Sequence, residues 1–305
     1  YKYHVFIDFR EVRDNEWHQY AQIASYLNGR GVPNLDEALK EMILQPIQNA
    51  FKELVTPIMF RKLLEFCTTE PEVKPDQKTL DEIEQKSINL LREAKRLSRG
   101  VEDEMAVARE IRRKLEAALR LPSVIRQLAW AKNLQKKLTE GIYTWGTLLS
   151  WLFVYALGKV VNQREFAEQS RSWIDEWRLG KTIVGILMDL GQEETAAWRS
   201  VTVIKLLTRH QHWFEVPASA QNPPYQVLEL LLKDGEVDQF LQVNRYNDIL
   251  WFNGEAFDEL RGWLLPVAAV EIISDPLRSP SEIVKEIERC HGILQKWEEA
   301  EKGSE

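Results

Sequence analysis

Apolar residues recur at intervals of three and four along most of the chain, which is the spacing of one buried face of an α-helix. This pattern predicts helices at 14–28, 34–55, 56–67, 79–98, 101–121, 123–139, 143–161, 163–177, 181–190, 193–209, 225–233, 255–273 and 281–301. Because proline cannot donate a helix hydrogen bond, we expect a kink at Pro46 and a change of helix at Pro266. The predicted fold class is all-α, an irregular multi-helix bundle.

Several residues mark where these helices begin and end. Asn34 with Glu37, Thr79 with Glu82, and Ser279 with Glu282 have the three-residue spacing of a capping box. Gly29 follows the first apolar run, at a position that favours a left-handed helix end. Residues 217–224 are rich in proline and small polar side chains and predict a surface loop.

The first ten residues follow a different pattern. Apolar and aromatic residues alternate there with other side chains, which predicts a short strand. A single strand leaves its backbone groups unpaired. Because the sequence starts with Tyr1 rather than methionine, we interpret 1–10 as a strand left from a preceding domain.

Charge and proline divide the remainder into regions. We predict an N-terminal helical part at 11–67, a linker at 68–78, a charged helical hairpin at 79–139 that projects from a bundle or packs on it, and a tryptophan-rich helical core at 140–305. A continuous helical domain over 14–305 is the alternative. The hairpin holds 14 basic and 9 acidic side chains, whereas 215–305 holds 8 and 18. These opposite charges would favour contact between the two regions.

Composition excludes several classes of protein. The chain has 305 residues, of which 44% are hydrophobic and 29% charged, as expected of a folded globular protein. A net charge of −7 argues against a nucleic-acid coat protein. Two cysteines exclude a disulfide framework and fit a reducing, cytoplasmic compartment. Residues 141–158 carry no charge, but their glycines and hydroxyls favour a buried core helix over a membrane span.

Motifs that suggest chemistry are incomplete. Gly180-Lys181-Thr182 lacks the second glycine of a phosphate-binding loop, and Glu288 with His291 lacks the second pair that a di-iron site needs. His210 and His212 are two residues apart at a predicted helix end, where a positive charge suits the helix dipole. We therefore expect no catalytic residue, no metal site and no cofactor. A solvated, ion-paired helix face explains the basic residues Arg109, Arg112, Arg113, Lys114 and Arg120.

Tryptophan is unusually frequent, with eleven residues. Most tryptophans of a helical protein are buried anchors, but an exposed one offers a flat apolar face for stacking. We expect at least eight of the eleven in the core and assign the others to a binding surface.

The segment 240–263 contains Asn244-Arg245-Tyr246, then Leu250-Trp251-Phe252-Asn253, then Trp263. It resembles a helical region that follows the sugar-cleaving barrel in long bacterial α-amylase-type proteins. Leu27–Pro33 and His212–Glu215 are similar to that family too. The barrel's Asp-x-x-x-Asn-His and His-Asp signatures are absent from this sequence. The resemblance therefore implies an accessory region without the catalytic domain.

The leading hypothesis is a non-catalytic helical docking domain of a glucan-processing enzyme. The domain would contact a preceding catalytic domain, another protein or α-glucan. The sequence leaves its oligomeric state open. Neither nucleic acid nor a membrane is expected as a partner. The predicted binding residues are Asn244, Arg245, Tyr246, Trp251 and Asn253; alternatively, the two asparagines cap helices and Trp251 fills the core. A helical protein–protein interaction module unrelated to carbohydrate is the second hypothesis. An enzyme built on Glu193, Glu194 and Glu215 is a third, which no residue spacing supports.

Overall fold

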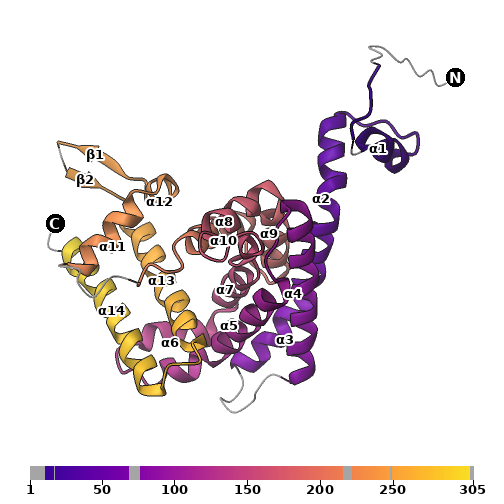
Figure 1. Cartoon of the computed structure of the whole chain (residues 1–305). Helices are drawn as coiled ribbons and strands as arrows, with labels where there is room; N and C mark the ends of the chain where they lie inside the picture. The colour runs from indigo at the N-terminus through magenta and orange to yellow at the C-terminus, as the bar shows by residue number, and fades with distance from the viewer. Residues whose placement is uncertain (1–10, 17, 69–75, 216–221, 248, 303–305) are drawn as a thin grey trace. The chain divides into compact units, whose positions relative to one another are not determined.

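The computed structural model describes residues 11–16, 18–68, 76–215, 222–247 and 249–302. Over these ranges the fold is all-α with one two-stranded antiparallel sheet (Figure 1), which confirms the predicted class. The predicted strand at 1–10 lies outside the described residues. The elements are α1 Gln19–Leu27, α2 Leu35–Leu54, α3 Pro57–Thr68, α4 Gln77–Ser98, α5 Glu104–Ile125, α6 Lys132–Glu140, α7 Ile142–Val154, the 3₁₀ helix η1 Leu157–Val160, α8 Ala167–Glu176, α9 Leu179–Asp189, α10 Glu194–Arg209, α11 Pro223–Leu232, α12 Gly235–Leu241, β1 Asn244–Tyr246, β2 Ile249–Trp251, α13 Gly254–Ser274 and α14 Pro280–Lys302.

Two compact units divide the chain, Tyr1–Ile47 and Gln48–Glu305. In the first unit, α1 begins later than predicted because Asp14 caps it from outside, accepting hydrogen bonds from the backbone N–H groups of Tyr20 and Ala21 at 3.0 and 3.1 Å. The helix ends at Asn28, with φ of 44°, just before Gly29. Asn34 caps α2 as predicted, and Pro46 lies within that helix.

The second unit is organised around α7. Every side chain from Trp145 to Val154 is buried. Helices α5, α9 and α10 pack against it. The uncharged segment is therefore the central helix of the core, as predicted.

The charged hairpin packs on the bundle and does not project from it. Its helices α4 and α5 pack along each other, and α5 also packs along α13. The opposite charges of the two regions meet where Lys114 of α5 pairs with Glu271 of α13. Apolar residues of α5, such as Ile111 and Leu115, are buried in the same unit. The Lys114–Glu271 ion pair therefore lies among buried apolar side chains of the contact.

Two predicted helix boundaries at prolines are wrong. Helix α5 continues through Pro122 to Ile125, and α13 continues through Pro266 to Ser274. Both prolines are buried among apolar neighbours. Because proline removes only one backbone hydrogen bond, burial of the surrounding turns can stabilise a continuous helix.

Of the two capping boxes predicted in the second unit, one is confirmed and one is wrong. Ser279 and Glu282 form the predicted box at the start of α14, since Ser279 N–H donates to Glu282 Oε2 at 2.8 Å. Thr79 does not cap α4. That helix begins at Gln77, and Asp76 accepts a hydrogen bond from Thr79 N–H at 2.6 Å. Asn222 caps α11 within the predicted loop, the rest of which lies largely outside the described residues.

Six of the ten described tryptophans are buried, fewer than the eight expected: Trp145, Trp151, Trp173, Trp177, Trp213 and Trp297. Trp130 and Trp263 are half-buried. Trp198 and Trp251 are exposed, at 44% and 59% of their surface. Cys290 is buried and free, as expected of a core cysteine, and burial raises the pKa of its thiol to about 12. The Cys67 side chain lies outside the described part.

Candidate functional site

Four of the five predicted binding residues, all except Asn253, lie on a small β-hairpin that the sequence pattern did not predict. Strand β1 pairs antiparallel with β2, in the register Asn244 with Trp251, Arg245 with Leu250 and Tyr246 with Ile249. Asn247, the first residue of the two-residue turn, has φ of 49°, a conformation that asparagine tolerates well. Figure 1 shows the hairpin, in orange, extending away from α12 and α13.

One face of this hairpin carries both of its large exposed aromatic side chains. Directly paired residues share a face, and every second residue of a strand points the same way. Asn244, Tyr246 and Trp251 therefore lie on one face, with Arg245 on the other. Tyr246 is 68% exposed and Trp251 59% exposed. Together these three residues form what we call the aromatic face.

The base of the hairpin is fixed to the start of α13. Asn253 N–H donates to the carbonyl of Leu241 at 2.8 Å, which closes the chain between α12 and α13. The Asn253 side chain caps α13 by accepting a hydrogen bond from Ala256 N–H at 3.0 Å. Next to it, the rings of Phe252 and Phe257 lie 4.9 Å apart. These contacts give the hairpin a defined origin on the helices.

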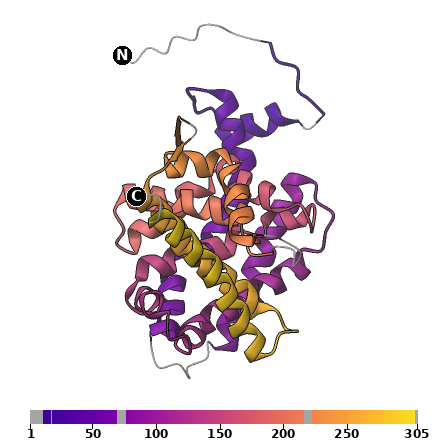
Figure 2. The same cartoon turned by 90° about the vertical axis from the view of Figure 1, so that its left-hand side faces the viewer.

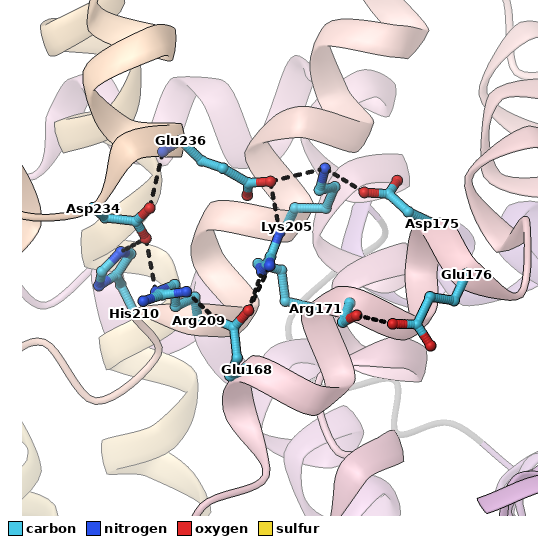
Figure 3. Close-up of polar contacts among 10 residues, drawn as sticks. Glu168, Arg171, Asp175, Glu176, Lys205, Arg209, His210, Asp234 and Glu236 are labelled. Carbon is cyan, nitrogen blue, oxygen red and sulfur yellow. Dashed lines mark hydrogen bonds and ion pairs between the residues drawn. The ribbon is translucent and has the colours of Figure 1, made fainter.

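A chain of alternating charges holds α12, from which the hairpin emerges (Figure 3). Asp234 precedes α12, accepts a hydrogen bond from Glu236 N–H at 2.9 Å and forms an ion pair with Arg209 Nε at 2.8 Å. Glu236 pairs with Arg171 Nη1 of α8 at 2.6 Å and with Lys205 Nζ of α10 at 3.2 Å. This network ties α12 to α8 and α10.

Histidine also takes part in this network. His210 Nε2 lies 2.8 Å from Asp234 Oδ2. Burial lowers the pKa of the His210 imidazole, although the nearby Asp234 carboxylate favours the charged form. For Asp234, burial raises the carboxyl pKa, but the hydrogen bonds from Glu236 N–H and His210 and the charge of Arg209 together lower it. At neutral pH the pair is a neutral imidazole that donates to a carboxylate, which is a structural contact.

The alternative interpretation, in which the two asparagines cap helices and Trp251 fills the core, is correct for Asn253 only. Asn253 is a helix cap, so its side-chain oxygen is engaged and we leave it out of the aromatic face. Asn244 is a strand residue and not a cap, and Trp251 is exposed instead of filling the core. Arg245 is brought beside the others but faces the opposite side.

The sequence contains a hairpin signal that helical periodicity concealed. Residues 246–251 read Tyr-Asn-Asp-Ile-Leu-Trp, a two-residue polar turn between residues that favour strands. The short helix α12 was missed as well, because seven residues are too few to show a clear helical period.

The histidines of the incomplete motifs each contact a different partner. His212 pairs with Glu215, whereas His210 pairs with Asp234. His291 stacks on Trp130 with ring centroids 3.6 Å apart, and Gly180 lies within α9. In the part of the chain that the structure describes, no group of three or more His, Cys, Asp or Glu residues is arranged to hold a metal ion.

A second unusual feature is a buried cluster of charges between α5, η1 and α13. Lys114 was predicted to lie on a solvated face, but only 2% of its side chain is exposed. Its ammonium pairs with Glu271, lies 3.4 Å from Glu110 Oε1 and sits 3.9 Å above the ring centre of Tyr155. The spacing of Lys114 from Ile111 and Leu115 on the apolar face of α5 could have indicated this burial.

Glu110 connects the members of this cluster. Both of its carboxylate oxygens accept hydrogen bonds from Lys159 Nζ at 2.7 Å, and Tyr155 donates its hydroxyl at 3.0 Å. Burial raises the Glu110 pKa, but the charges of Lys114 and Lys159 and these hydrogen bonds together lower it below its ordinary value. Burial raises the pKa of the Tyr155 hydroxyl well above its ordinary value. The cluster therefore contains two ammonium groups, those of Lys114 and Lys159, and two carboxylates, those of Glu110 and Glu271, whose charges compensate one another.

None of the described helices is both long enough and apolar enough to cross a lipid bilayer. Comparison with known proteins gives no relative: no protein-family model, no curated protein and no solved structure matches the chain.

Proposed function

We propose that the chain is a non-catalytic helical accessory domain that docks onto α-glucan through the aromatic face of its β-hairpin. The observation that carries this proposal is the exposure of Tyr246 and Trp251 on one face of a two-stranded ribbon. Burial of such side chains contributes roughly 1.5–3 kcal/mol each, a stabilisation that the folded chain does not gain here and that a partner covering them would provide. The buried free thiol of Cys290 fits our assignment of this domain to the reducing cytoplasm.

The chemistry of the aromatic face suits a sugar chain. Aromatic rings stack on the apolar faces of sugar rings, and Asn244, directly across from Trp251, offers both a donor and an acceptor to hydroxyl groups. The resemblance of 240–263 to the helical region of α-amylase-type proteins supports the same ligand. In this proposal a catalytic domain elsewhere acts on the glucan that the hairpin holds.

Co-sedimentation with insoluble starch tests the proposal. We expect the wild-type chain to sediment with starch and the Trp251→Ala and Tyr246→Ala variants to remain mainly in the supernatant. Trp198→Ala is the matched control, because Trp198 is also exposed but lies on α10. It should sediment as the wild type does. A wild-type chain that stays wholly in the supernatant would reject glucan as the ligand.

A protein partner is the second candidate, and the backbone of the hairpin favours it. In a two-residue hairpin the pair next to the turn exchanges hydrogen bonds and the following pair does not. Arg245 and Leu250 form that following pair, so their backbone groups point outward, where a strand from another protein can add.

Arg245→Pro separates the two candidates, because proline removes the outward N–H and leaves both aromatic side chains in place. Glucan binding through the aromatic face predicts that this variant still sediments with starch. If neither the wild-type chain nor Arg245→Pro binds starch, and only the wild type forms a complex with another protein, strand addition is supported instead.

A further inference from the structure

Two adjoining cavities lie between α5 and the segment that joins α13 to α14. Their volumes are about 280 and 320 Å³, and both are lined by Arg113, Ser274, Asp275, Pro276 and Arg278. Arg120 lines the smaller cavity, whereas Lys159, Glu215 and Glu271 line the larger. Because five residues line both of them, the two cavities lie side by side in the second unit.

The basic residues of α5 differ in what they contact. Arg109 Nε donates to the carbonyl of Met105 at 3.2 Å, and Arg112 pairs with Asp81 at 2.7 Å and with Glu116 at 3.2 Å. Arg113 and Arg120 are exposed, and within the described ranges neither guanidinium has a hydrogen bond or an ion pair. The two arginines of α5 that line the smaller cavity are thus the ones with unused donors.

The carboxylates of the smaller cavity are already engaged. Glu116 pairs with Arg112, and Asp275 accepts hydrogen bonds from Arg278 Nε and from Leu277 N–H, both at 3.0 Å. The two helix ends at this place, the C-terminus of α13 and the N-terminus of α14, have opposite partial charges. The positive excess therefore rests on the guanidinium groups of Arg113 and Arg120.

We propose that Arg113, Arg120 and Arg278 bind the phosphate group of a small phosphorylated molecule, whose polar remainder extends into the larger cavity. A guanidinium presents paired N–H donors that match two phosphate oxygens, which makes arginine the preferred residue for such recognition. The larger cavity is lined by the carboxylates of Glu215 and Glu271, which can accept further hydrogen bonds from hydroxyl groups beside their pairs His212 and Lys114, whereas the Lys159 ammonium is engaged with Glu110. This site is separate from the hairpin and does not depend on its function.

Isothermal titration calorimetry at low salt tests the proposal, with inorganic phosphate, glycerol 3-phosphate and uncharged glycerol as probes. We expect both phosphate compounds to bind, the ester more tightly, and glycerol not to bind. The Arg113→Ala/Arg120→Ala double variant should bind phosphate at least about tenfold more weakly, because two charge-assisted contacts are lost.

Arg109→Ala is the control, since it removes one positive charge from the same helix outside both cavities. It should change the phosphate affinity by less than about twofold, as expected for a screened charge outside the site. Thermal unfolding of each variant verifies that it folds. The proposal is overturned if wild-type protein binds neither phosphate compound, or if Arg109→Ala weakens binding as much as the double variant does. Equal affinity for phosphate and its ester would overturn the role of the larger cavity.

Discussion

The α5–α13 contact and the β-hairpin place their polar and apolar groups in opposite ways. The contact buries Lys114 beside Glu110 and Glu271, which are side chains that normally remain in water. The hairpin exposes Tyr246 and Trp251, which normally lie inside. Figure 2 shows α14 crossing the face of the second unit that also carries the hairpin.

Residues of the α5–α13 contact stabilise the fold, whereas the exposed residues of the hairpin are available to contact a partner. A buried charge is tolerated only when partners compensate for its lost hydration, so each member of the Lys114 cluster depends on the others. The exposed aromatic side chains of the hairpin have few partners and contribute little to folding. Substitutions in the first region should therefore change stability, and those in the second should change binding alone.

The largest expected effect is that of Lys114→Ala. It leaves the half-buried carboxylates of Glu110 and Glu271 without their shared, fully buried cation, which should lower the free energy of unfolding by about 3–5 kcal/mol. Urea denaturation followed by circular dichroism measures this loss. Lys86→Ala is the matched control, because Lys86 pairs with Glu82 at 2.7 Å on an exposed helix face and should cost less than about 0.5 kcal/mol. Similar losses for both variants would remove the distinction between buried and exposed pairs.

Glu110→Gln should produce a smaller, pH-dependent loss. The glutamine keeps the shape of the side chain but loses its charge, at a cost of about 1–3 kcal/mol at pH 7. Because the pKa of Glu110 is lowered in the folded protein, its stabilisation is present above the ordinary value of 4.5 and is lost as the pH falls through the lowered folded value. Unfolding curves of wild type and variant should therefore converge at acidic pH. A difference that stays constant from pH 7 to pH 3 would contradict this role.

The smallest effect on stability is expected at the hairpin. Trp251→Ala and Tyr246→Ala should each change the free energy of unfolding by less than about 0.5 kcal/mol. Trp145→Ala provides the contrast, because Trp145 is 1% exposed and donates its indole N–H to the carbonyl of Leu138 at 2.7 Å. Its loss should cost about 3–5 kcal/mol. A large destabilisation by Trp251→Ala would mean that the hairpin is part of the core.

Helical periodicity predicted the fold well where one face of a helix is buried, and the uncharged segment that became α7 is the clearest case. It failed where tertiary packing overrides a local rule, as at Pro122 and Pro266, because burial compensates for one missing hydrogen bond. The five predicted binding residues are close together in the sequence, but their arrangement on and beside a hairpin depends on strand pairing that periodicity does not reveal. The buried position of Lys114 was missed because its charge was given more weight than its apolar neighbours on α5.

Fluorine NMR of the chain labelled with 5-fluorotryptophan tests the central claim most directly, because each tryptophan gives its own resonance. A Trp251→Phe variant identifies the Trp251 signal, and maltoheptaose is then added to the wild type. The account predicts that the Trp251 resonance shifts in a saturable way while the resonances of the buried Trp145 and Trp151 do not move. A Trp251 resonance that is unchanged at saturating maltoheptaose would contradict it.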